Sequence, residues 1–283
     1  MIDDSYGGTS EHFDFGRVLS RIFSVIGRNF MPFFVIALIL EGIPTFLMSA
    51  APYMALGEVF SQSGFIKMLI NDELSGGMIT LLVVGGIVGF VLYLLVYLTL
   101  QGTLIHASVE DFKGENVSIR ESLSIGWRFA LPLLGFSILS SLGIGLGLVL
   151  LIVPGILLIC MWMVGAASVV LEGGGVFNAF GRSVELTKGY KWWILLILIV
   201  YFIAVFFITV IGELFAIPLE LSEANIFTGD SVGTVNVIIY SLIQALVAAA
   251  TILMSSAGVA SLYYELRGVK EGGFKDNLAA VFD

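Results

Sequence analysis

The chain has 283 residues, of which 58% are hydrophobic and 12% are charged, and its mean hydropathy is +1.02. A soluble domain carries about 25% charged residues, so one packed core could not hide this much apolar surface. The net charge of −9 argues against a nucleic-acid-binding face, and the single cysteine, Cys160, excludes an intrachain disulfide. The composition therefore indicates an all-α integral membrane protein.

The first 13 residues form a polar tail that is acidic where a signal peptide would be basic, so we expect insertion without cleavage. Six apolar stretches follow, and each is long enough to cross about 30 Å of hydrocarbon, which takes about 20 helical residues. They cover approximately residues 30–50, 79–107, 131–151, 154–171, 192–217 and 235–262. The sequence thus predicts six transmembrane helices.

The third and fourth stretches are one apolar run that is interrupted by Val153-Pro154-Gly155. Proline suits the first turn of a helix and breaks a helix interior. We therefore expect a tight helical hairpin at this point in place of one very long helix.

Basic residues test the number of spans. Of the 13 lysines and arginines, 12 lie in segments on the same side of the membrane as the N-terminus, and Lys67 is the exception. Because basic residues stay in the cytoplasm during insertion, this division predicts that both termini are cytoplasmic.

The spans group into three similar units, at about residues 14–114, 115–175 and 176–268, within a single membrane domain of residues 14–262. Each unit begins with an amphipathic segment that ends at a basic residue and finishes with a glutamate followed by glycine. The aligned residues are Arg28, Arg128 and Lys191 at the start, and Glu110, Glu172 and Glu265 at the end. Because every unit starts and finishes on one side, these would be parallel helical-hairpin repeats. The alternative is that all membrane boundaries look alike. Residues 269–283 would be a cytoplasmic tail.

Each amphipathic segment is predicted to be a separate cytoplasmic helix that lies in the headgroup plane. Their basic side chains are candidate contacts to lipid headgroups. These candidates are Arg17, Arg21, Arg28, Arg128, Arg182, Lys188 and Lys191. The simpler alternative is that the segments only set the depth of the span that follows.

Three polar residues within the spans form a candidate intramembrane site, because such residues are costly in hydrocarbon. They are Glu41 in the first span, Glu213 near the outer end of the fifth and Gln244 in the sixth. One interpretation has Glu41 and Gln244 line a polar cavity for a substrate or a proton. The other has Glu41 hydrogen-bonded at a kink before Gly42 and Pro44, and Gln244 bonded to a neighbouring helix.

The motif Val153-Pro154-Gly155-Ile156 is followed by Leu158, Trp162, Glu172, Ala179, Arg182-Ser183, Leu186, Gly189 and Trp192. This pattern resembles the six-span membrane domain associated with bacterial glycerophosphodiester phosphodiesterases and related inner-membrane proteins of unknown function. The resemblance is clearest over residues 120–195. It implies a bacterial inner-membrane location. The catalytic barrel of the fused relatives has no counterpart in residues 263–283, so we carry over no phosphodiesterase activity.

The sequence shows no nucleotide-binding loop and no zinc-type Cys/His cluster, and His12 and His106 lie in unrelated surroundings. We therefore expect no enzymatic activity, catalytic residue, cofactor or metal. The leading hypothesis is a protein that binds or moves a lipid or small amphiphile in the bilayer, or that supports a membrane-protein partner which does. The alternative is a membrane scaffold or shaping protein that acts through its amphipathic helices.

Overall fold

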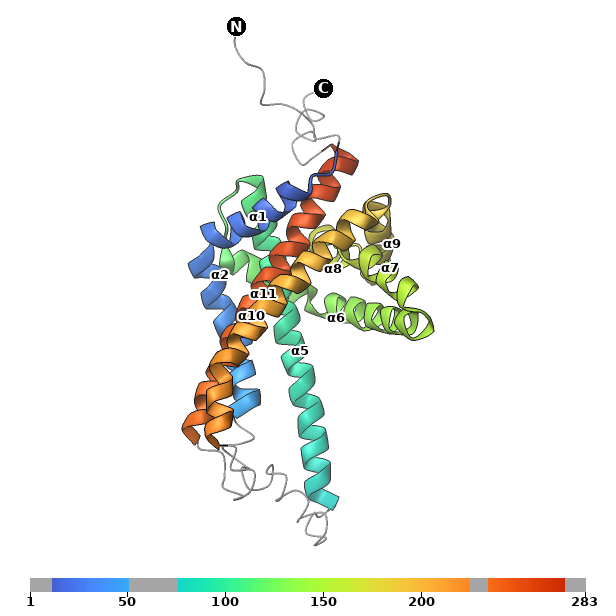
Figure 1. Cartoon of the computed structure of the whole chain (residues 1–283). Helices are drawn as coiled ribbons and strands as arrows, with labels where there is room; N and C mark the ends of the chain where they lie inside the picture. The colour runs from blue at the N-terminus through green and yellow to red at the C-terminus, as the bar shows by residue number, and fades with distance from the viewer. Residues whose placement is uncertain (1–11, 51–75, 224–233, 273–283) are drawn as a thin grey trace. The chain divides into compact units, whose positions relative to one another are not determined.

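The computed structural model describes residues 12–50, 76–223 and 234–272, with side chains throughout except at 78–79, 81–82, 217–223 and 234. Every regular element in these ranges is a helix (Figure 1). The helices are α1 (Phe15–Arg28), α2 (Phe30–Ala37), the π-helix η1 (Leu38–Gly42), α5 (Gly76–Lys113), α6 (Ile119–Leu150), α7 (Ile152–Trp162), α8 (Gly165–Glu172), α9 (Val176–Thr187), α10 (Lys191–Glu223) and α11 (Thr234–Glu271). Residues 43–50 continue η1 as an α-helix.

Six helical stretches of the described chain are long and apolar enough to cross a membrane. They are Phe30–Ala50, Val83–Lys113, Ile119–Leu150, Ile152–Glu172, Lys191–Ala216 and Val235–Glu271. The prediction of a six-span, all-helical membrane protein is therefore confirmed. The sixth helix continues to Glu271. Residues 263–271, which the sequence predicted to follow the last span, are therefore part of the same helix.

The predicted helix before each odd-numbered span is separate in two places. α1 is divided from α2 at Asn29, and α9 is divided from α10 near Gly189, whose φ is +94°. The middle prediction is wrong, because α6 runs without a break from Ile119 to Leu150. No left-handed glycine interrupts this stretch, and Ser118 caps its start by accepting a hydrogen bond from the backbone N–H of Glu121.

The glycines after the three aligned glutamates also differ. Gly114 and Gly173 adopt positive φ immediately after α5 and α8, as expected of residues that end a helix. Gly268, in contrast, lies within α11, which ends before Gly272, where φ is +79°. The third helix exit therefore lies further along the chain than the predicted repeat placed it.

The predicted hairpin between the third and fourth spans is confirmed. Leu151 is the one extended residue between α6 and α7, and Pro154 lies in the first turn of α7 (Figure 1). A Cβ atom on Gly147 would lie 3.0 Å from the Cα atom of Gly155, so glycine at both positions lets the two arms approach. The fourth span consists of two helices, because α7 ends at Trp162 and α8 begins at Gly165.

The chain divides into two compact units. The first comprises Met1–Phe33, Leu98–Phe202 and Leu253–Asp283, and the second comprises Phe34–Tyr97 and Ile203–Ile252. The three longest helices, α5, α10 and α11, contribute residues to both units. The prediction of one domain over residues 14–262 stays a prediction.

Glycine also sets the closest helix contact in the first unit, between α5 and α6. A Cβ atom on Gly126 would lie 2.3 Å from the carbonyl oxygen of Thr99 and 2.3 Å from Oγ1 of Thr103. One on Gly102 would lie 3.1 Å from the Cα atom of Gly126. The two backbones therefore touch at this crossing, and a residue larger than glycine at position 126 would force them apart.

Candidate functional site

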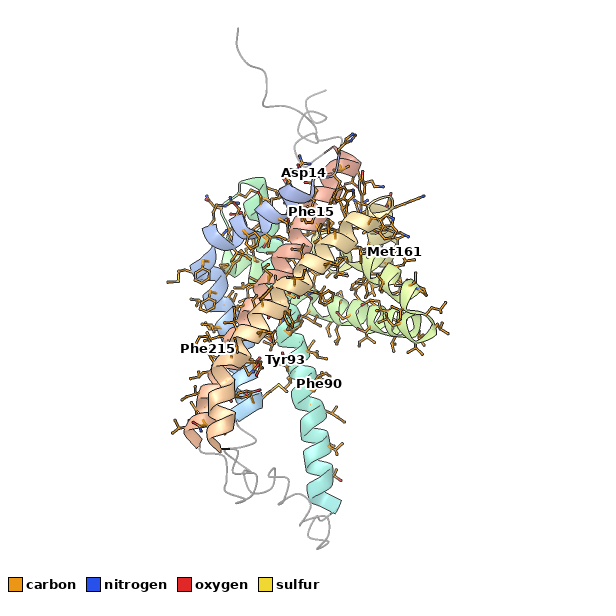
Figure 2. All side chains as sticks on the ribbon, in the orientation of Figure 1. Asp14, Phe15, Phe90, Tyr93, Met161 and Phe215 are labelled. Carbon is orange, nitrogen blue, oxygen red and sulfur yellow. The ribbon has the colours of Figure 1, made fainter. Side chains whose placement is uncertain are left out.

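Glu265 is the centre of an ion-pair network between α1 and α11. Its side chain is only 2% exposed and accepts hydrogen bonds from Arg17 at 2.5 Å and from Arg21 at 2.5 Å. The backbone N–H of Asp14 donates to the same carboxylate at 3.1 Å, at the start of α1 (Figure 2). Two cations and a helix N-terminus thus stabilise one buried negative charge.

The buried stripe of α1 explains why this helix lies against the protein. Val18, Ile22 and Val25 are buried at helical spacing, and the carbonyl oxygen of Val18 accepts a hydrogen bond from the Ser261 hydroxyl on α11 at 2.9 Å. Phe23 lies on the other side and remains exposed. The amphipathic character of this segment therefore serves packing against α11 as well as any contact with lipid.

The end of α1 is held to the end of α5. Arg28 pairs with Asp111, and the side-chain amide of Asn29 donates to the same carboxylate at 2.9 Å. The hydrogen bond that Arg28 donates to Asp111 raises the pKa of Arg28, just as the hydrogen bond that Arg17 donates to Glu265 raises the pKa of Arg17. Both guanidinium groups therefore stay charged at any physiological pH.

A second network joins α8, α9 and α11. Arg182 donates to Glu172 at 2.9 Å and pairs with Glu271, which also accepts a hydrogen bond from Arg267 at 2.9 Å. The hydroxyl of Tyr263, whose side chain is fully buried, donates to Glu172 at 2.7 Å. Partial burial lowers the pKa of Arg182, but its bonds to the two carboxylates outweigh that effect and raise the pKa above its ordinary value.

Packing fixes α9 in this position. The hydroxyl of Ser183 donates to the carbonyl oxygen of Met161 on α7 at 2.8 Å (Figure 2). The ring of Phe180 lies 4.5 Å from that of Phe136 on α6 and 4.9 Å from that of Trp162 on α7. Aromatic contacts at these distances stabilise the helix group formed by α6, α7, α8 and α9.

The seven predicted headgroup contacts thus fall into two groups. Arg17, Arg21, Arg28 and Arg182 are engaged by carboxylates of the protein itself. Arg128 and Lys188 are exposed, and Lys191 is half-buried.

Large aromatic side chains surround the exposed cations. Trp127, which is 67% exposed, precedes Arg128, and Trp192, which is 83% exposed, follows Lys191. Phe177 on α9 is also exposed. Exposed tryptophan beside a cation is typical of a membrane–water interface.

The remaining aligned glutamate, Glu110 at the end of α5, has different neighbours from Glu172 and Glu265. His106 on α5 lies 3.1 Å from the hydroxyl of Ser122 on α6 and 3.7 Å from Glu110. The Oε2 atom of Glu110 is buried and makes no hydrogen bond with the described residues. Glu110 is therefore held by a histidine where Glu172 and Glu265 are held by arginines.

In the second unit, Glu41 lies in the π-helix and is only 3% exposed. Its Oε1 atom accepts a hydrogen bond from the hydroxyl of Tyr93 on α5 at 2.7 Å, whereas Oε2 has no partner (Figure 2). The π-helix has a local cause: Pro44 cannot donate to the carbonyl of the fourth residue before it, and Ile43 instead donates to Leu38.

The other two predicted intramembrane residues pair with each other. The side-chain amide of Gln244 on α11 donates to Glu213 on α10 at 2.9 Å. The structure records no hydrogen bond between this pair and Glu41. The candidate site is thus two polar pairs, in one of which Gln244 bonds a neighbouring helix, as the second interpretation expected.

Sequence reasoning missed Tyr93 as the partner of Glu41, and missed the hydroxyls of Thr45 and Ser241, which are buried and make no hydrogen bond. Counting hydroxyl groups along with ionisable and amide side chains would have drawn attention to all three. It also missed that Glu265 binds Arg17, because 248 residues separate them.

Within the described ranges, no three His, Cys, Asp or Glu side chains converge in a way that could hold a metal ion. We compared the chain with known protein families, curated proteins and solved structures, and no family model, curated protein or solved structure matches it.

Proposed function

We propose that this integral membrane protein is not an enzyme and that it binds anionic lipid headgroups at the cytoplasmic face of a bacterial inner membrane. The observation that carries the proposal is the pair of exposed cations Arg128 and Lys188, with exposed tryptophans near them in the sequence at positions 127 and 192. Cations near a membrane surface attract anionic lipid by about 1 kcal/mol each.

The ion-pair networks support assigning some arginines to helix packing and the exposed cations to lipid binding. A guanidinium that already donates to carboxylates of the protein has few hydrogen bonds left for a phosphate, so Arg17 and Arg182 hold the helices together. Arg128 and Lys188 are exposed and form no ion pair with a described carboxylate, so their donors are available for a ligand. Lipid recognition is thus assigned to α6 and to the end of α9.

The same networks support three parallel repeats around an axis along the membrane normal. Arg17 in the first unit binds Glu265, the last glutamate of the third unit. Arg182 in the third unit binds Glu172, the last glutamate of the second unit. His106, beside Glu110, contacts Ser122 in the next unit. A closed ring of this kind would place both termini and all of these contacts in the cytoplasm, in keeping with the basic residues.

The test is lipid preference in a defined bilayer. The full chain is reconstituted, and the association of spin-labelled phosphatidylglycerol is compared with that of phosphatidylcholine. Wild type should prefer phosphatidylglycerol, and Arg128→Gln with Lys188→Gln should weaken that preference by up to about 30-fold, since two contacts contribute about 2 kcal/mol.

Lys67→Gln is the matched control, because it removes a positive charge that the sequence places on the opposite side of the membrane. It should leave the preference unchanged. Equal association of the two lipids with wild type, or an unchanged preference in the double variant, would refute the proposal.

A second candidate function is membrane shaping, as in a scaffold. It is favoured by the exposed rings of Phe23 on α1 and Phe177 on α9, each of which lies outside the buried stripe of its helix. Exposed rings on interfacial helices wedge between headgroups. Replacing both with Ser should then abolish vesicle deformation by the protein and leave the lipid preference as in wild type.

A further inference from the structure

If Glu41 were ionised, no positive charge among the described side chains of its unit would compensate it. Among the described side chains of the second unit, the ionisable acids are Glu41 and Glu213, and there is no Lys, Arg or His. Glu213 has an amide donor in Gln244, whereas Glu41 has the phenol of Tyr93. A bare carboxylate with one neutral donor is costly inside a membrane protein, because neither water nor a cation compensates the lost hydration.

The unused hydrogen-bonding atoms of this unit lie on the helices that meet at Glu41. Thr45, one helical turn after Glu41, lies beside both Glu41 and Tyr93, but its hydroxyl makes no hydrogen bond of good geometry. The Oε2 atom of Glu41 is likewise buried and unpaired. The hydroxyl of Thr45 can accept a hydrogen as well as donate one, so it could accept a hydrogen from a protonated Oε2.

α11 contributes a third unpaired group. A Cβ atom on Gly42 would lie 3.6 Å from the carbonyl oxygen of Ala245, so α11 packs against the π-helix at this level. The buried hydroxyl of Ser241, one turn before Ala245, also has no partner. The group that contacts Glu41 from α5 is the hydroxyl of Tyr93, and the next titratable group on α5, Tyr97, is a phenol as well. The polar side chains of α11 near Ala245 are those of Ser241 and of Gln244, which donates to Glu213.

We propose that Glu41 is a proton-binding site, and that its carboxyl group is neutral in the structure described here. Tyr93 then donates to Oε1, and the proton on Oε2 is directed to the hydroxyl of Thr45. Release transfers this proton to water and leaves a carboxylate that retains the hydrogen bond from Tyr93. The π-helix is the segment that would rearrange to admit the water, since its wide turn is less constrained than an α-helical one.

This inference does not depend on lipid binding. It assigns a proton to the second unit as its ligand, and binding a proton requires neither a cavity nor a cation. A protein that takes up a proton within the membrane would respond to the pH on the side from which water reaches Glu41.

The test is infrared difference spectroscopy on the full chain in lipid nanodiscs, with the pH changed from neutral to alkaline. Wild type should lose a protonated-carboxyl carbonyl band that shifts in deuterium oxide. Glu41→Gln should remove the band. Glu213→Gln, which changes the other intramembrane acid, should keep it.

A wild type without the band, or a band that persists in Glu41→Gln and vanishes in Glu213→Gln, would overturn the assignment. Should Glu41→Gln not fold, Tyr93→Phe provides the second variant. Removing a donor to the carboxylate disfavours the charged form, so the band should disappear at a higher pH than in wild type. An unchanged or lower midpoint would contradict the proposal.

Discussion

The two units of this protein bind their acidic side chains in different ways. In the first unit, Glu265 and Glu172 are each bound by arginine, and other donors complete their hydrogen bonds. In the second unit, Glu41 and Glu213 are held by a phenol and an amide. The first arrangement pairs opposite charges and ties helices together, and in the second, by our proposal, Glu41 gains or loses a proton. The comparison separates acids that are bound by cations from acids whose recorded donors are neutral.

The largest expected effect comes from removing the central carboxylate of the first unit. Glu265→Ala removes the shared acceptor of Arg17 and Arg21, and the loss of these charge-assisted hydrogen bonds should lower the free energy of unfolding by about 3 kcal/mol, since both arginines are partly hydrated. Glu185→Ala is the control, because that carboxylate is 70% exposed and contacts Arg182 only at its edge. Denaturant unfolding in micelles measures both. Equal losses in the two variants would show that the buried network does not stabilise the unit.

The next effect tests the glycine crossing between α5 and α6. Gly126→Ala forces a methyl group against the backbone at Thr99, and overpacking of this kind costs about 1–3 kcal/mol. Gly145→Ala, in the same helix, meets nothing within 4 Å and should be neutral or slightly stabilising. Thermal unfolding of the two variants compares them directly. If Gly145→Ala were the more damaging, the crossing would not be where the structure places it.

The smallest effect separates hydrogen bonding from charge in the first unit. Tyr263→Phe removes the hydrogen bond donated to Glu172 and the one accepted from Arg267, and it leaves Arg182 in place, so the expected loss of stability is about 1 kcal/mol. Because the pKa of Arg182 is raised, the contribution of its positive charge is full below its unfolded pKa and is lost only as the pH rises through the still higher folded value. Unfolding from neutral to moderately alkaline pH should therefore show no weakening from this group, in wild type or variant.

The predicted elements that rested on composition or on a local break were confirmed. Long apolar stretches identified six spans, and Pro154 marked the hairpin, because a proline that begins a helix cannot lie in the interior of a longer one. The prediction that an amphipathic helix separate from the third span precedes it was wrong, because α6 is continuous. A basic and aromatic boundary looks the same in sequence whether the backbone turns there, as at Asn29, or continues, as through Trp127.

The sequence by itself determined that this chain lives in a bilayer, because apolar length and charge are properties of each segment alone. It also identified Glu41, Glu213 and Gln244 as costly residues. Only the tertiary structure decided their partners, since Tyr93 is 52 residues from Glu41, and Arg17 is 248 residues from Glu265. Hydrogen bonds and ion pairs depend on distance in space to within a fraction of an ångström, and residues far apart in sequence reach such distances only when helices pack.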